Sequence, residues 1–121
     1  MLASNKIIMN ATDVSVSVNS PGYWLDQVYG IAIQAEFSGS PVGVVVLQGS
    51  CDHGGSGMPG QPPNEASVVN WTTISGSSQA VTGAGPVVWN FNGVFYKWIR
   101  MSYSASSGTG TVTVTVNTKG E

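Results

Sequence analysis

The sequence predicts an all-β domain, built as a two-sheet antiparallel β-sandwich or jelly roll. Three observations favour this class: apolar residues recur at every second position, Gly and Pro separate the short runs, and no segment repeats at the helical period. Eight or nine short strands joined by turns are typical of two packed sheets. With 121 residues, we expect 1–121 to form a single domain whose core needs no metal or disulfide.

The first half of the chain contains the strands that alternate most regularly. Lys6–Asn10 is a short first strand, and Val14–Val18 is a second strand with one wet face. Ile31–Phe37 carries its apolar residues on one face, whereas Gly43–Gln48 is apolar on both faces, which is typical of a central strand. The tight turn Ser38–Pro41 between them predicts that these two strands form a hairpin.

The second half begins with short segments and ends with longer strands. Trp98–Ser104 alternates apolar and polar residues, and Thr111–Asn117 places valines on one face and threonines on the other. The threonine face is a candidate subunit surface. Three shorter strands are expected at 71–74, 79–82 and 87–90.

A long exposed loop is predicted at about 52–69. The segment is rich in Gly and Pro and has no periodicity. Long loops of this kind are either mobile or functional. We therefore treat His53, Met58 and Pro59 as candidate interface or ligand contacts.

The chain is poor in charge, which limits the partners that it can bind. Charged residues make up 8% of the sequence and the net charge is −2, against about 25% charged residues in an average globular protein. The four basic residues form no cluster in the sequence, so we expect no nucleic-acid partner and no membrane partner. The longest apolar run is too short to span a bilayer, and no signal peptide is expected.

Catalytic or metal chemistry is not indicated, and we expect neither an enzyme nor a bound cofactor. Cys51, Asp52 and His53 are adjacent, but a zinc site needs three or four ligands and nothing marks the others. A pair of carboxylates could support hydrolysis, which is the weakest hypothesis because scattered acids offer such a pair by chance. The candidate acids are Asp13, Asp26, Glu36, Asp52 and Glu65.

The aromatic residues are the most informative set. Trp71, Trp89 and Trp98 fall within predicted strands, so we expect them in the core. Tyr23 and Trp24 follow a Pro-Gly turn, so we expect them to be exposed and to contact a subunit or a ligand. Two or more tryptophans on one exposed face, with Asp or Asn beside them, would instead indicate a sugar-binding module. Arg100 fits either a buried ion pair or an outward subunit contact.

Three stretches resemble segments of small structural proteins of tailed bacteriophages and related viruses. They are Tyr29–Ser50 (YGIAIQAEFSGSPVGVVVLQGS), Asn70–Phe91 (NWTTISGSSQAVTGAGPVVWNF) and Tyr96–Gly120 (YKWIRMSYSASSGTGTVTVTVNTKG). This chain departs from the family pattern by an insertion at about His53–Val69, a plausible place for a protein-specific contact. The resemblance implies a virion component with a β-sandwich or jelly-roll fold, of the decoration, spike, fibre or tail-adaptor type, and it supplies no catalytic residue.

The function expected from this resemblance is structural. The chain would form an oligomer, with a homotrimer favoured, and would bind other virion proteins on the major capsid or tail. It would be located in the virion after assembly in the cytoplasm of the bacterial host. The alternative is a carbohydrate-binding, lectin-like module for host recognition, whose partner would be a host surface glycan.

Overall fold

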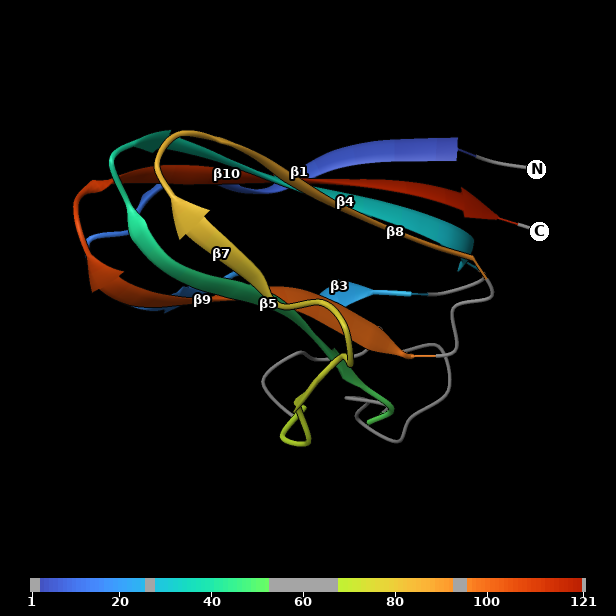
Figure 1. Cartoon of the computed structure of the whole chain (residues 1–121). Helices are drawn as coiled ribbons and strands as arrows, with labels where there is room; N and C mark the ends of the chain where they lie inside the picture. Colours follow the sequence, from blue (N-terminus) through green and yellow to red (C-terminus); the bar gives the residue numbers. More distant parts are fainter. Residues whose placement is uncertain (1–2, 26–27, 53–67, 93–95, 121) are drawn as a thin grey trace.

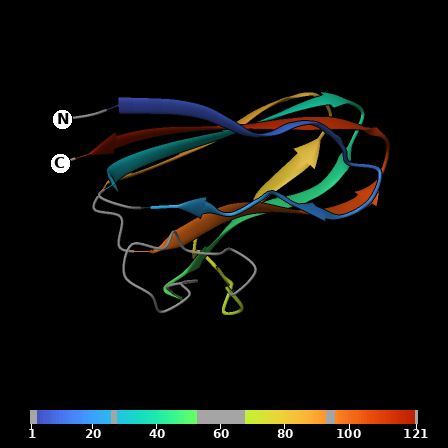
Figure 2. The ribbon, with the colours of Figure 1, turned by 180° about the vertical axis from the view of Figure 1, so that it is seen from behind.

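Two antiparallel β-sheets pack face to face and form the whole described architecture (Figure 1). The computed structural model describes residues 3–25, 28–52, 68–92 and 96–120, and every regular element in these ranges is a strand. The two layers are equally distinct when the molecule is seen from behind (Figure 2). The predicted all-β sandwich is therefore confirmed.

Ten strands lie in the described part of the chain. Sheet A has the order β1-β10-β4-β8, and sheet B has the order β2-β9-β5-β6, with β3 pairing to β9 and β7 pairing to β5. In chain order the strands are β1 Ala3–Asp13, β2 Val18–Asn19, β3 Tyr23–Trp24, β4 Val28–Gly39, β5 Val42–Ser50, β6 Thr72–Thr73, β7 Gln79–Thr82, β8 Gly85–Asn92, β9 Trp98–Ser107 and β10 Gly110–Gly120.

The connectivity is that of a jelly roll. β2 and β3 follow one another along one edge of β9, and β6 and β7 do the same along one edge of β5, so each pair acts as one interrupted edge strand. Eight strand positions result, and only the step from β5 to β6 stays within a sheet. Two sheets of four positions with this order are the double Greek key of jelly rolls.

The predicted hairpin between Ile31–Phe37 and Gly43–Gln48 is wrong. The first segment lies in β4 of sheet A and the second in β5 of sheet B, so the chain crosses between the layers at Ser38–Pro41. Both strands turn their apolar residues inward, and these residues meet across the core instead of side by side. β5 is nevertheless central, as predicted, because it lies between β9 and the β6–β7 edge.

The predicted strand Val14–Val18 is also largely wrong. Only Val18, with Asn19, belongs to a strand, β2. Val14 is fully buried and its N–H donates to the Gly110 carbonyl at 3.1 Å, whereas Val16 is 62% exposed. Residues 14–17 connect β1 of sheet A to β2 of sheet B, so their alternating apolar and polar residues do not mark a strand.

Two crossings between the layers pack against each other at one end of the sandwich. The β4–β5 crossing meets the β9–β10 crossing, where the Ser40 N–H donates to the Thr109 carbonyl at 2.8 Å. A Cβ atom on Gly108 would overlap the Ser40 carbonyl oxygen, and one on Gly110 would overlap the Ser38 carbonyl oxygen. Gly108 also has a φ of +85°, which favours glycine. Only backbone without side chains fits between these crossings.

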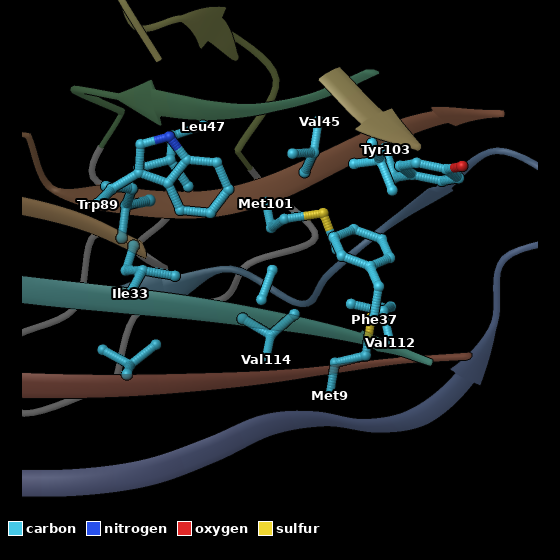
Figure 3. Packing of buried hydrophobic residues seen from close by; sticks show 14 of the residues in the cluster. Met9, Ile33, Phe37, Val45, Leu47, Trp89, Met101, Tyr103, Val112 and Val114 are labelled. Carbon is cyan, nitrogen blue, oxygen red and sulfur yellow. The ribbon is translucent and has the colours of Figure 1, made fainter. Parts of the chain in front are cut away.

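The core fills the space between the sheets with aliphatic and aromatic side chains (Figure 3). Sheet A supplies Phe37 and the buried valines of β10, and sheet B supplies Val45, Leu47 and Met101. The rings of Phe37 and Tyr103 lie 5.3 Å apart, tilted by 48°, which is a favourable aromatic geometry. The Tyr103 hydroxyl is buried without a hydrogen-bond partner among the described residues, and burial raises the pKa of this group.

The tryptophans divide between core and surface. Trp89 and Trp98 are buried, as predicted, but Trp71 is only half-buried and precedes β6 instead of lying in a strand. Trp89 in sheet A donates its indole N–H to the Ser77 carbonyl at 2.8 Å. The buried Ser77 hydroxyl accepts the N–H of Leu47, on β5, at 3.1 Å. Ser77 therefore links the two sheets at the β7–β8 side of the sandwich.

We expect Gly108→Ala to destabilise the fold strongly, and Gly76→Ala to serve as its matched control. Both glycines have φ near +80°, but a Cβ on Gly76 meets nothing within 4 Å. The left-handed backbone should cost each variant about 1–2 kcal/mol. Gly108→Ala should lose a further ~1–3 kcal/mol, because the Ser40 backbone must move. Urea denaturation measures both free energies of unfolding, and equal losses would contradict close packing of the crossings.

Candidate functional site

A groove of about 440 Å³ opens on the side of the sandwich between the edge strands β1 and β3. This volume lies within the range of small-ligand sites, about 300–1,000 Å³. Its lining is apolar or aromatic apart from one lysine. The lining residues are Lys6, Ile7, Ile8, Pro21, Gly22, Tyr23, Trp24 and Trp98.

Pairing with β9 holds two aromatic residues of this groove, Tyr23 and Trp24, in place. Tyr23 and Trp24 form β3, and Trp24 lies directly opposite Trp98. Between β2 and β3, Ser20 bonds to Met101 of β9 through both its backbone and its side chain. The Ser20 N–H donates to the Met101 carbonyl, and the Ser20 hydroxyl accepts the Met101 N–H, both at 2.8 Å. Ser20 is buried, so these bonds are shielded from water. The turn and β3 are thereby fixed against the sheet.

The groove presents aromatic surface and one positively charged side chain. Trp24 is 38% exposed and Trp98 is 5% exposed, so the first offers an accessible ring while the second is mostly covered. Tyr23 is half-buried and packs against the core. Lys6 is the one charged side chain among the lining residues, and none of those residues carries a carboxylate or an imidazole. Such a lining can stack on a ligand and pair with an anion.

The structure brings only some of the predicted site residues together. Tyr23 and Trp24 both line the groove, although their role as contacts stays a prediction. His53, Met58 and Pro59 lie outside the described residues. Sequence reasoning missed Lys6 and Trp98, because only the folded register places β1 and the start of β9 beside β3.

The base of the predicted long loop is closed by one carboxylate. Asp52 accepts the N–H groups of Val69 and Asn70, each at 2.9 Å, and the Asn70 side-chain amide at 2.9 Å. These contacts hold Asp52, at the end of β5, against Val69 and Asn70, which precede β6. We call this set the Asp52 clamp.

The clamp depends on the ionised form of Asp52. Hydrogen bonds from Asn70 and Val69 lower the pKa of the Asp52 carboxyl below its usual value. A lowered pKa in the folded state means that the clamp stabilises the loop base above the ordinary pKa of aspartate, about 3.9. Its contribution is lost as the pH falls below that value.

Beside the clamp, Arg100 points outward and stacks on Trp71. Its guanidinium lies 4.3 Å from the centroid of the Trp71 ring, and its Nε donates to the Gln48 side-chain oxygen at 2.8 Å. Gln48 and Arg100 are paired across β5 and β9. The sequence left open whether the Arg100 side chain points into the core or outward. In the structure it points outward and is half-buried.

Among the described residues, the acids singled out by the sequence come from both sheets. Asp13 and Glu36 lie on strands of sheet A that are separated by β10, and Asp52 follows β5 of sheet B. Asp26 and Glu65 lie outside the described residues, as does His53, so the cluster with the exposed Cys51 stays untested. In the part of the chain that the structure describes, no three His, Cys, Asp or Glu side chains could hold a metal ion together.

Two other surface features bear on partners. The threonines at positions 111, 113 and 115 are half-buried on β10, which pairs with β1 on one side and β4 on the other. β10 therefore has no free edge, so a partner could contact it only through the threonine side chains and not by adding a strand. Within the described ranges, no helix has the length and apolarity needed to cross a membrane.

Comparisons with known proteins support the fold. No protein-family profile matches the sequence, and no curated protein matches it. Among solved structures, the SPBc2 prophage-derived protein YomS is similar, with a TM-score of 0.58, 14% identity, and coverage of 96% of this chain and 91% of that chain. The structure of the Gt strain of infectious bursal disease virus has a TM-score of 0.47 and 8% identity, over 97% of this chain and 31% of that chain. At 14% identity, the likeness to YomS shows a shared fold alone.

We expect Asp52→Ala to open the base of the loop. The variant removes the acceptor for the N–H groups of Val69 and Asn70, so their amide hydrogens should exchange several-fold faster at neutral pH. Asp13→Ala is the control, because Asp13 is also an exposed carboxylate that accepts hydrogen bonds, from Ser15. Hydrogen exchange followed by NMR measures both. Unchanged exchange in Asp52→Ala would show that the clamp does not hold this segment.

Proposed function

We propose that this chain is a structural component of a bacteriophage virion. It acts as a capsid-surface decoration, spike or fibre-type protein that forms an oligomer, with a homotrimer expected, and docks on the major capsid or tail. It assembles in the cytoplasm of the bacterial host and works by binding other virion proteins, without catalysis.

The observation that carries this proposal is the surface of the sandwich. Large apolar side chains are exposed on both sheets, whereas charged residues make up only 8% of the sequence. A free protein relies on charge for solubility, but a surface packed against other subunits is stabilised by burying apolar groups. The exposed large apolar residues among those described are Ile7, Val16, Trp24, Val42, Val44, Val69, Val88 and Tyr96.

The fold supports the same proposal. The similarity to a prophage-derived protein extends over nearly all of both chains, so it concerns the complete sandwich and not a shared fragment. The segments that resemble phage structural proteins include nearly all of β4 to β10, which build most of both sheets. A jelly roll is common in capsid proteins.

We expect peptides of this chain in purified virus particles. Particles from the phage or lysogen that encodes the chain would be banded on a density gradient and analysed by mass spectrometry. A virion component should co-purify with the major capsid protein in a constant ratio across the band. Detection only in the soluble fraction of the lysate would overturn the proposal.

A second candidate function is recognition of a surface glycan, favoured by the groove between β1 and β3. The exposed Trp24 ring could stack on a sugar, and Lys6 could pair with an acidic one. Against this reading, the groove contains one exposed tryptophan and no Asp or Asn among its lining residues. Structural docking is therefore the better supported function.

The glycan reading predicts binding that depends on Trp24. On an array of bacterial surface polysaccharides and uronic-acid oligosaccharides, Trp24→Ala should weaken binding about tenfold, because the stacking surface is lost. Val88→Ala is the control, since Val88 is exposed on sheet A and is not part of the groove. If the unmodified chain binds no glycan on the array, this second function is excluded for those sugars.

A further inference from the structure

The edge strand β1 is weakly anchored to the sandwich. It forms one edge of sheet A, the dark blue strand in Figure 2, and among the described strands it pairs with β10 alone. Between residues 5 and 13, Met9 is the only buried side chain, whereas Ile7 is 54% exposed. This stretch of β1 therefore adds a single buried side chain to the core.

The pairing of β1 with β10 is also interrupted. The register shifts between Ile7 and Met9 and again between Met9 and Thr12, and at each shift β1 advances one residue more than β10. On its other side, β10 pairs with β4 without a shift from Gly110 to Lys119. Because an extra residue disrupts the ladder locally, β10 holds β1 less regularly than it holds β4.

A strained residue joins β1 to the fixed part of the fold. Among the described residues, Ala11 is the one non-glycine residue with a positive φ, +46°, a conformation that is unfavourable for alanine. Its N–H donates to the Thr113 hydroxyl at 3.1 Å. Three residues later, Val14 is fully buried and its N–H donates to the Gly110 carbonyl at 3.1 Å. Ala11 is therefore a strained joint between a weakly held strand and a firmly held one.

These features favour exchange of β1 between copies of the chain. The place that β1 occupies on β10 fits this strand residue by residue, from Ala3 opposite Lys119 to Ile7 opposite Thr115. The same strand from a second copy would make the same pairs, so the occupant of that place is defined. Exchange would also release Ala11 from its strained conformation. Short hinges under strain favour this kind of swap, which forms an oligomer at low cost.

We propose that copies of this chain associate by exchanging β1, so that residues 3–9 of one copy pair with β10 of another. The inference rests on the proposed function, because it names the contact that forms the virion oligomer. Donation from each copy to the next closes a ring, of which the expected trimer is one case, and reciprocal donation gives a dimer.

The test places one cysteine on each side of the β1–β10 pair. Asn5→Cys and Asn117→Cys are combined with Cys51→Ser, which removes the one native cysteine. Asn5 and Asn117 lie directly opposite each other and their side-chain amides are hydrogen-bonded, so a disulfide can join these positions. The full chain is oxidised over a series of protein concentrations, denatured and separated on a non-reducing gel. Exchanged strands should give covalent oligomers, with trimers expected, that a reducing agent returns to 12.5 kDa.

The matched control joins two strands that do not exchange. Glu36→Cys and Thr113→Cys, again with Cys51→Ser, lie opposite each other on β4 and β10 and should form only intrachain disulfides. A 12.5-kDa band from the Asn5–Asn117 variant at every concentration overturns the inference, as do cysteines that stay unpaired. Covalent oligomers in equal amount from the control would mark the crosslinks as random and overturn it too.

A second variant tests the hinge. Glycine adopts a positive φ without strain, so Ala11→Gly in the Asn5–Asn117 variant should lower the share of covalent oligomers several-fold at a given concentration. Ala80→Gly is the control, because Ala80 is exposed on β7 and its φ is not positive. An equal share in both glycine variants would overturn the role of the strained hinge.

The outcomes separate this inference from the proposed function. Intrachain disulfides at every concentration, with the chain present in purified particles, overturn the exchange of β1 and leave virion docking standing. Interchain disulfides in the Asn5–Asn117 variant alone, with the chain absent from particles, support the exchange and overturn the virion role.

Discussion

Two backbone crossings that touch at one end of the molecule hold the rest of the sandwich in place. The β4–β5 and β9–β10 crossings approach so closely that Gly108 and Gly110 leave no room for a Cβ atom against the facing carbonyl groups. Because the first crossing carries the chain from sheet A to sheet B and the second carries it back, their contact sets the separation of the layers at that end. The inward rows of β4, β10, β5 and β9 then meet across the core, where the Phe37 and Tyr103 rings are in contact.

This connectivity determines which surfaces remain for binding. The inner faces of both sheets are used by the core, so only the outer faces, the edges and the loop base can contact partners. On one side the sandwich stays open between β1 and β3, and the groove with Trp24 forms there. On the β7–β8 side, Ser77 and Trp89 link the layers. The outer face of sheet B carries the valines of β5, and the Asp52 clamp lies beyond the end of that strand.

Parts of the site could be predicted because their signals are local. A Pro-Gly turn before Tyr23 and Trp24 indicated a surface position, and Trp24 is exposed, while Tyr23 is half-buried. Other parts depended on distant segments. Trp71 was expected in the core because it falls within a predicted strand, but it lies on the surface, where Arg100 from β9 stacks on its ring. The pairing of Trp24 with Trp98 required the register of β3 on β9.

By itself, the sequence determined the all-β fold class and the inward faces of the longer strands. Alternation at period two and β-branched residues act within a few neighbouring residues, so they can be read locally. The tertiary structure decided which strands are neighbours, including the replacement of the expected hairpin by a crossing at Ser38–Pro41. That choice depends on packing against Gly108 and Gly110, far along the chain, and it decides which outward valines the completed sheets leave uncovered.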